Sequence, residues 1–146
     1  MEISILFLPL IASIISGFFG KYIGDRNSEI VTSALVSISA LLSIFVLYQV
    51  IVNQYEENIV IATWINSGSL DVNWSMLIDP LSAVMLVVVT SVSSLVHIYS
   101  IGYMSHDPHK PRFMAYLSLF TFAMLMLVTS DNFIQLFFGW EGVGLC

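Results

Sequence analysis

Long unbroken apolar runs alternate with short polar segments along most of this chain. Four of the runs, residues 3–20, 30–52, 80–104 and 113–129, are continuous rather than amphipathic stripes. Each approaches or exceeds the roughly 17–25 residues that a helix needs to cross a bilayer. Because lipid offers no partner to open backbone N–H and C=O groups, a helix is the structure that such a run adopts. The pattern therefore predicts four membrane-spanning helices.

A fifth apolar run begins at Phe133, directly after Ser130, Asp131 and Asn132, whose side chains are well suited to cap a helix. It reaches Cys146 after about 14 residues, or roughly 21 Å of helix, which is less than the thickness of a bilayer core. We therefore expect a truncated fifth helix over residues 133–146. It is completed either by further residues of the same subunit or by a separate chain.

Between the second and third runs the pattern becomes typical of strands. Apolar and polar residues alternate from Leu70 to Ile78, and residues 58–65 are rich in β-branched side chains. Residues 66–69, Asn-Ser-Gly-Ser, separate the two segments as a turn. The pattern predicts a β-hairpin over residues 58–79 on the outer membrane surface. It is either a contact strip for neighbouring subunits or a lid over helix ends, and the sequence favours neither.

Composition and charge agree with a multi-pass membrane protein. Hydrophobic residues make up 58% of the chain, charged residues make up 10%, and the mean hydropathy is +0.91. The four basic residues are expected in two short loops, Lys21 with Arg26 and Lys110 with Arg112, which the positive-inside rule places on the cytoplasmic or matrix side. The net charge of −6 comes mainly from the outer segment and does not indicate a nucleic-acid partner. The predicted fold is an all-α polytopic membrane protein of about five helices with an outer-surface β-hairpin.

Glu141 is the one charged residue of the fifth run. At about 1.5 Å per residue it lies roughly 12 Å from the helix start, near the middle of a bilayer core about 30 Å thick. Ionised carboxylates at that depth are costly and are typical of proton or ion pathways. We predict that Glu141 is a buried proton-transfer residue; the alternative is a Glu that only supports helix packing. Gly139, Gly142 and Gly144 around it indicate close helix approach.

A stripe of polar residues follows the 80–104 run. The stripe shares one helix face, which we expect to point into the bundle, because its members recur at spacings of three and four: Thr90, Ser93, Ser94, His97 and either Ser100 or Ile101. His97 is a candidate for a proton path, because imidazole changes its charge near neutral pH. The alternative is that these small polar side chains only form hydrogen bonds between helices.

The remaining polar motifs indicate no cofactor and no metal in this chain. His106 and His109 flank Asp107, but there is no further cluster of cysteine or histidine with the spacing of a zinc site. Cys146 is the single cysteine, which excludes an intrachain disulfide and a cysteine-ligated cluster. No flavin or nicotinamide motif is present, so redox chemistry is not expected here.

Several segments resemble one family of respiratory proteins. They are Asp-Pro-Leu-Ser at 79–82, His-Ile-Tyr-Ser-Ile-Gly-Tyr-Met at 97–104, His-Asp-Pro-His-Lys-Pro-Arg-Phe at 106–113, Ser-Asp-Asn at 130–132 and Gly-Trp-Glu-Gly-Val-Gly-Leu-Cys at 139–146. The family is subunit 5 of mitochondrial NADH:ubiquinone oxidoreductase (complex I), the counterpart of bacterial subunit L. The resemblance covers an N-terminal portion of that subunit and is densest from about residue 74 onward.

The resemblance implies a proton-translocating, antiporter-like subunit of the complex I membrane arm, which couples NADH:ubiquinone electron transfer to proton pumping. In this family the glutamate of helix five, here Glu141, belongs to the proton-translocation machinery and pairs with a lysine that lies beyond residue 146. Flavin, iron–sulfur clusters and quinone are expected in partner subunits, and the implied partners are other membrane subunits of complex I, the remainder of the same subunit and membrane lipids. The implied location is the mitochondrial inner membrane, with a bacterial plasma membrane as the alternative.

Two other functions fit the same residues. One is a subunit of a multisubunit cation/proton antiporter, which would also use Glu141 but would have no NADH-linked partner. The other is a structural membrane fragment that a second chain completes. Copurification with flavin-bearing and iron–sulfur-bearing subunits would separate complex I from the antiporter.

Overall fold

The computed structural model describes residues 1–68 and 70–146, which form five helices and one β-hairpin. In chain order the elements are α1 (Glu2–Ile23), α2 (Asp25–Asn53), β1 (Glu57–Ser67), β2 (Leu70–Ile78), α3 (Pro80–Tyr103), α4 (Lys110–Val128) and α5 (Phe133–Leu145). Helices α1 to α4 are long and apolar enough to cross a membrane, and α5 is a shorter apolar helix of 13 residues. The predicted fold class is confirmed.

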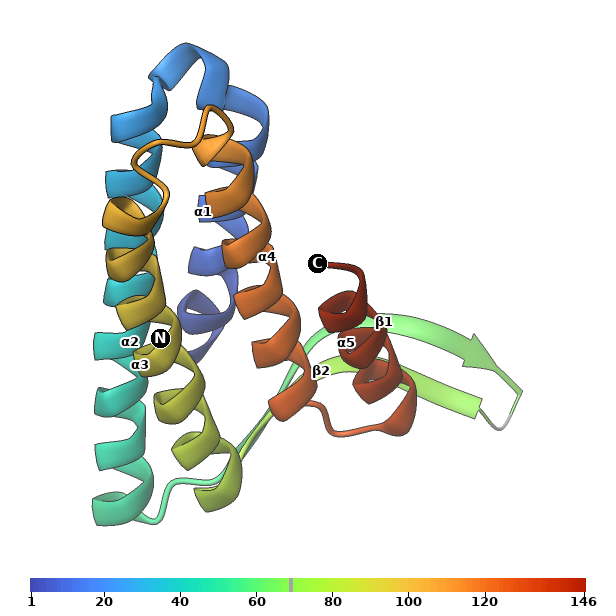
Figure 1. Cartoon of the computed structure of the whole chain (residues 1–146). Helices are drawn as coiled ribbons and strands as arrows, with labels where there is room; N and C mark the ends of the chain where they lie inside the picture. Colours follow the sequence, from blue (N-terminus) through green and yellow to red (C-terminus); the bar gives the residue numbers. More distant parts are fainter. Residues whose placement is uncertain (69) are drawn as a thin grey trace.

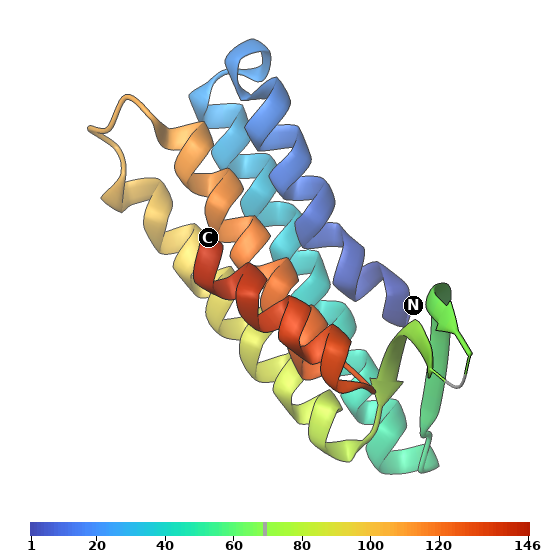
Figure 2. The same cartoon turned by 90° about the vertical axis from the view of Figure 1, so that its right-hand side faces the viewer.

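Helices α1 to α4 run alongside one another as a bundle (Figures 1 and 2). The α1–α2 turn and the α3–α4 loop lie at one end, and the hairpin leaves the bundle at the other (Figure 1). The main apolar core lies toward the hairpin end, where Ile5, Val46, Met76, Leu86 and Met126 are almost completely buried. It joins α1, α2, α3 and α4 to strand β2.

The first two helices reach further than the predicted 3–20 and 30–52. A single residue, Gly24, separates α1 from α2, and its φ of 86° lies in the region that side-chain-bearing residues avoid. Lys21 and Arg26, which we expected in a loop, therefore lie on helices. The third and fourth helices come close to the predicted ranges, except that α4 already begins at Lys110.

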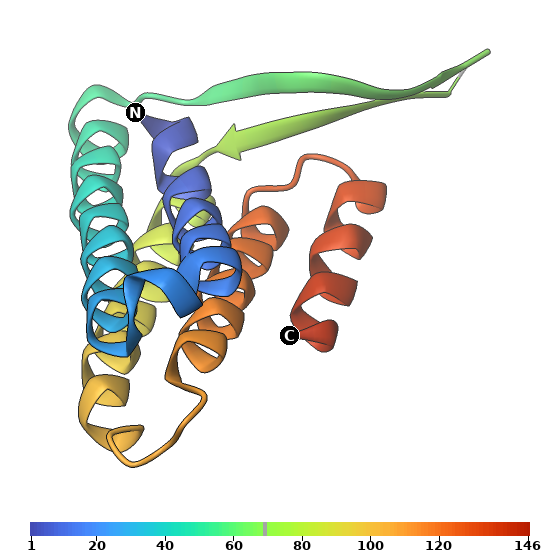
Figure 3. The same cartoon turned by 90° about the horizontal axis from the view of Figure 1, so that it is seen from above.

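The hairpin is a two-stranded antiparallel sheet that pairs Glu57 with Ile78 at its base and Ser67 with Leu70 near its tip. The predicted turn over 66–69 includes Ser69, which lies outside the described residues. The hairpin covers the helix ends only with its base. Its tip extends sideways past α5 (Figures 1 and 3). The base thus has the position of a lid, while the tip projects away from the bundle.

Helix α5 packs beside α4, which separates it from the rest of the bundle (Figure 3). The contact needs small residues: a Cβ on Gly139 would lie 2.8 Å from the Leu127 backbone nitrogen, and one on Gly142 would lie 3.1 Å from the Ala123 Cβ. The expected close helix approach is therefore present at Gly139 and Gly142. At Gly144 no atom lies within 4 Å of an added Cβ.

Candidate functional site

Glu141 lies in the second half of α5, on a face that does not contact α4. Successive helix residues turn by about 100°, so Glu141 lies roughly 100° from Gly142 and 160° from Gly139, the two residues at the α4 contact. Its side chain is exposed, and no residue in 1–68 or 70–146 forms an ion pair or hydrogen bond with it. The predicted burial of Glu141 is wrong for the described residues, because the bundle packs against the glycine face of α5 instead.

The start of α5 is held by the hairpin through Gln135, which is fully buried. Its side-chain Oε1 accepts a hydrogen bond from the Ser75 backbone N–H at 3.0 Å, and its Nε2 donates to the Ser75 carbonyl at 2.6 Å. Ser75 is itself buried. Since one side chain satisfies both backbone groups of a buried strand residue, this pair fixes the height of α5 relative to β2.

Asn132 joins the same contact as the N-cap of α5, as the capping pattern predicted. Its side-chain oxygen accepts from the Gln135 backbone N–H at 2.8 Å, and its Nδ2 donates to the Asn73 carbonyl at 2.9 Å. We call Asn73, Ser75, Asn132 and Gln135 the hairpin–α5 contact. Further out, Trp64 and Trp74 of the hairpin pack against Phe138 of α5, with ring centroids 4.9–6.0 Å apart.

Asp131 lies beside this contact, in the loop between α4 and α5. Its Oδ2 accepts a hydrogen bond from the Asn58 side chain of β1 at 3.0 Å. Partial burial raises the pKa of Asp131, but nearby donors on Ser75, Asn58 and Asn132 outweigh that effect and hold it below its ordinary value. The charged carboxylate thus favours attachment of the hairpin to this loop.

His97 is completely buried between α3 and α4. Its Nδ1 lies 2.8 Å from the carbonyl of Ser93, and its Nε2 lies 3.0 Å from Oγ of Ser118. A neutral ring with the proton on Nδ1 satisfies both, because it donates to the carbonyl and accepts from the hydroxyl. Beside it, the hydroxyls of Ser93 and Thr121 are 2.5 Å apart. These contacts form a hydrogen-bonded link between α3 and α4.

The predicted polar stripe of α3 points into the bundle, as expected. Thr90 bonds Ser43 of α2 at 2.7 Å, and Ser94 bonds Ser37 of α2 at 2.8 Å. With the His97 contacts, these bonds form a row of polar groups along α3 that faces α2 and α4. His97 lies on α3 and Glu141 on α5, and no hydrogen bond between described residues joins this row to Glu141, so these bonds do not connect the two predicted site residues.

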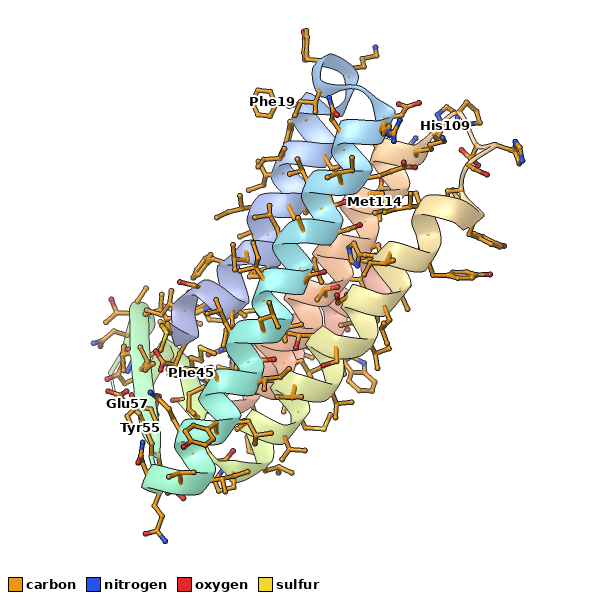
Figure 4. The ribbon with its side chains drawn as sticks, turned by 90° about the vertical axis from the view of Figure 1, so that its left-hand side faces the viewer. Phe19, Phe45, Tyr55, Glu57, His109 and Met114 are labelled. Atoms are coloured by element: carbon orange, nitrogen blue, oxygen red, sulfur yellow. The ribbon has the colours of Figure 1, made fainter. Side chains whose placement is uncertain are left out.

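The end of the bundle away from the hairpin contains a buried charge that the sequence did not single out. Glu29, near the start of α2, is only 4% exposed, and its Oε1 lies 4.0 Å from the Lys110 Nζ at the start of α4. From the sequence we interpreted Lys110 only as one of the basic residues that mark the cytoplasmic or matrix side. His109, one residue earlier, lies at this end of the molecule (Figure 4). Within the described ranges no three His, Cys, Asp or Glu side chains gather as a metal site.

The fold and these contacts define a polytopic helical membrane protein whose short apolar helix, held by a surface hairpin, carries an acidic residue. Sequence comparison with known proteins points to a particular family within this class. A family model described as NADH-Ubiquinone oxidoreductase (complex I), chain 5 N-terminus, matches residues 64–114. The predicted resemblance is confirmed: the chain is similar over its whole length to the N-terminal part of NADH-ubiquinone oxidoreductase chain 5.

Three relatives show how far the similarity extends. NADH-ubiquinone oxidoreductase chain 5 of Arabidopsis thaliana is 56% identical over 145 residues, 99% of this chain. The proteins of the same name from Phytophthora infestans and Trichophyton rubrum are 53% and 51% identical over 99% and 100% of this chain. The chain spans 22% of the length of each of these relatives.

Proposed function

We propose that this chain is the N-terminal part of a proton-translocating membrane-arm subunit of respiratory complex I. This proposal rests on the sequence identity of 51–56% to chain 5 proteins over nearly the whole chain, including the helix that bears Glu141. Four helices suited to cross a membrane support a membrane-embedded location. We place that location in the mitochondrial inner membrane, with other complex I subunits as partners and the redox cofactors in those partners.

In this proposal Glu141 takes up and releases protons, and a cation outside residues 1–146 pairs with it. Two features of the structure support this role. The hairpin–α5 contact holds the start of the helix, and the glycine face holds its side against α4, so the exposed face that carries Glu141 is left open to such a partner. Moving one proton against about 200 mV costs roughly 4.6 kcal/mol, which the change in pairing has to supply.

We include His97 as a secondary proton carrier. It is the one residue of the α3 polar row with an imidazole ring, which can carry a proton, and the hydroxyls of Ser93 and Ser118, which can both donate and accept, lie next to it. The hydrogen bonds of His97 equally support a packing role. The proton-to-electron ratio of a His97 variant is therefore interpreted separately from that of a Glu141 variant.

The test is the proton-to-electron ratio of the assembled complex that contains the full-length subunit. Glu141→Gln should lower that ratio while NADH:ubiquinone electron transfer and assembly persist, because the amide keeps the shape but not the titratable group. Glu56→Gln, the same change at an exposed outer position, is the matched control and should leave the ratio unchanged. An unaltered ratio in Glu141→Gln would refute the role of Glu141.

His97→Gln is measured in the same assay, since an amide can also bond a carbonyl and a hydroxyl. A lower ratio in an intact complex supports proton transfer through His97, and an unchanged ratio assigns it to packing alone. If the full-length protein copurifies without flavin-bearing and iron–sulfur-bearing subunits, the complex I assignment itself fails.

A further inference from the structure

A groove of about 770 Å³ runs between α1 and α4 at the end of the bundle opposite the hairpin. Figure 2 shows these two helices approaching that end together, with α5 lower down on α4. Gly17 and Ala115 form a narrow floor, since a Cβ on Gly17 would lie only 3.5 Å from that of Ala115. Ile14 and Phe18 line one wall, and both are exposed to the surroundings.

The two ends of the groove differ in chemistry. Lys21, His109 and Arg112 lie at the end near the α1–α2 turn, together with one carboxylate, Asp25. Neither Lys21 nor Arg112 forms an ion pair with any residue that the structure describes, whereas Lys110 nearby pairs with Glu29. This end of the groove, which we call its mouth, therefore carries an excess of exposed positive charge. Away from the mouth, the lining becomes apolar toward Leu10 and Leu119.

The length of the groove matches one leaflet of a bilayer. From Lys21 to Leu10 is eleven residues of helix α1, or roughly 16 Å at about 1.5 Å per residue. Half of a hydrocarbon core about 30 Å thick is roughly 15 Å. An acyl chain that follows α1 from the mouth would reach the bilayer centre near the far end of the groove.

We propose that this groove binds one phospholipid with an anionic headgroup, from the leaflet on the side of the α1–α2 turn. Its phosphate lies between Lys21 and Arg112, and an acyl chain lies over Gly17 and Ala115. Basic pockets between spanning helices recognise such headgroups because a phosphodiester neutralises cations that no carboxylate pairs with. Arg112 has only uncharged contacts, a 3.4 Å hydrogen bond to the Tyr116 hydroxyl and the face of the Tyr116 ring, so its charge is still unmatched by the described residues. A neutral lipid or an apolar protein helix would leave the charge at the mouth unmatched.

The binding test uses the native full-length protein in the assembly with which it purifies, reconstituted into phosphatidylcholine nanodiscs that contain a photoreactive phosphatidylglycerol. After illumination, labelled peptides are mapped by mass spectrometry. Labels should fall on residues 10–21 and 112–119, and excess unlabelled phosphatidylglycerol should remove them. Excess phosphatidylcholine or inorganic phosphate should not. The readout is lipid labelling, so it does not depend on proton pumping or on the function proposed above.

The double variant Lys21→Gln/Arg112→Gln should need roughly 30-fold more phosphatidylglycerol for half-maximal labelling of these peptides, given the usual contribution of two cations near an anionic surface. Arg26→Gln, a change of the same kind on an exposed residue outside the groove, should label like the wild type. Ser13→Leu, which fills the apolar part without touching the mouth, should also reduce labelling.

The proposal fails if a photoreactive phosphatidylcholine labels the groove as well as the anionic probe does. It also fails if the double variant labels like Arg26→Gln. Labelling that maps only to other surfaces, with another protein segment crosslinked to residues 112–119, would show that a protein occupies the groove instead.

Discussion

Replacing Gln135 with leucine should detach the hairpin from α5 while changing little in the size of the side chain. In the wild type the Gln135 amide satisfies both backbone groups of Ser75, and both residues are fully buried. Leucine leaves that N–H and C=O without a partner. Each orphaned buried group costs about 1–3 kcal/mol, so the pair costs at least about 2 kcal/mol.

Hydrogen–deuterium exchange of the full-length protein measures this loss directly. A local opening that is about 2 kcal/mol easier raises the exchange rate of amides in β2 roughly 30-fold, at 1.4 kcal/mol per factor of ten. Peptides of α3, which do not depend on this contact, should exchange as in the wild type. Gln49→Leu is the matched control, because Gln49 is half-buried on α2 and its side chain makes no hydrogen bond to the described residues.

The reasoning is refuted if residues 70–78 of the Gln135→Leu variant exchange within about threefold of the Gln49→Leu control. That result would mean that the aromatic contacts of Trp64 and Trp74 with Phe138, rather than the buried amide, hold the hairpin against α5.

Two further predictions concern the same region. Gly139→Ala should lower the thermal unfolding midpoint, because it places a Cβ within 2.9 Å of the Leu127 backbone and such overpacking costs about 1–3 kcal/mol. Gly144→Ala is the control and should leave the midpoint unchanged, because a Cβ there meets nothing within 4 Å. The pKa of Asp131 is lower in the folded protein than the ordinary 3.8, so its contribution to stability is complete above that value and is lost as the pH falls through the folded pKa. Trp64 fluorescence should report this acid transition, and Asp131→Asn should remove it; an identical acid transition in both proteins would contradict it.

The spans, the hairpin and the inward polar stripe were predictable because each depends on a local periodicity. Apolar runs long enough to cross a bilayer leave helices as the available structure, and the alternation from Leu70 to Ile78 can only place one set of side chains on one face. The helical spacing of Thr90 and His97 likewise fixed their shared face before any packing was known.

What the sequence did not reveal depends on contacts between distant segments. Gln135 is one polar residue in an apolar run, and its partner, the backbone of Ser75, carries no signal in the side-chain pattern. The Glu29–Lys110 pair joins residues 81 positions apart. The burial of Glu141 was inferred from depth alone, but depth along a helix does not determine which face packs, and here the glycine face does.

These contacts explain how α5, a helix of only 13 residues, can hold the Glu141 carboxylate at a defined place. In lipid, apolar surface provides no driving force for helices to associate, so close packing and polar contacts have to supply the specificity. The hairpin–α5 contact sets the height of α5, and the Gly139 approach to Leu127 sets its rotation. A slip of one residue would move Glu141 by about 1.5 Å along the axis and turn it by about 100°. Gln135 lies six residues before Glu141, roughly 9 Å along the axis, so the contact at the start of α5 determines how far along the bundle the carboxylate lies, and the glycine face determines the direction in which it points.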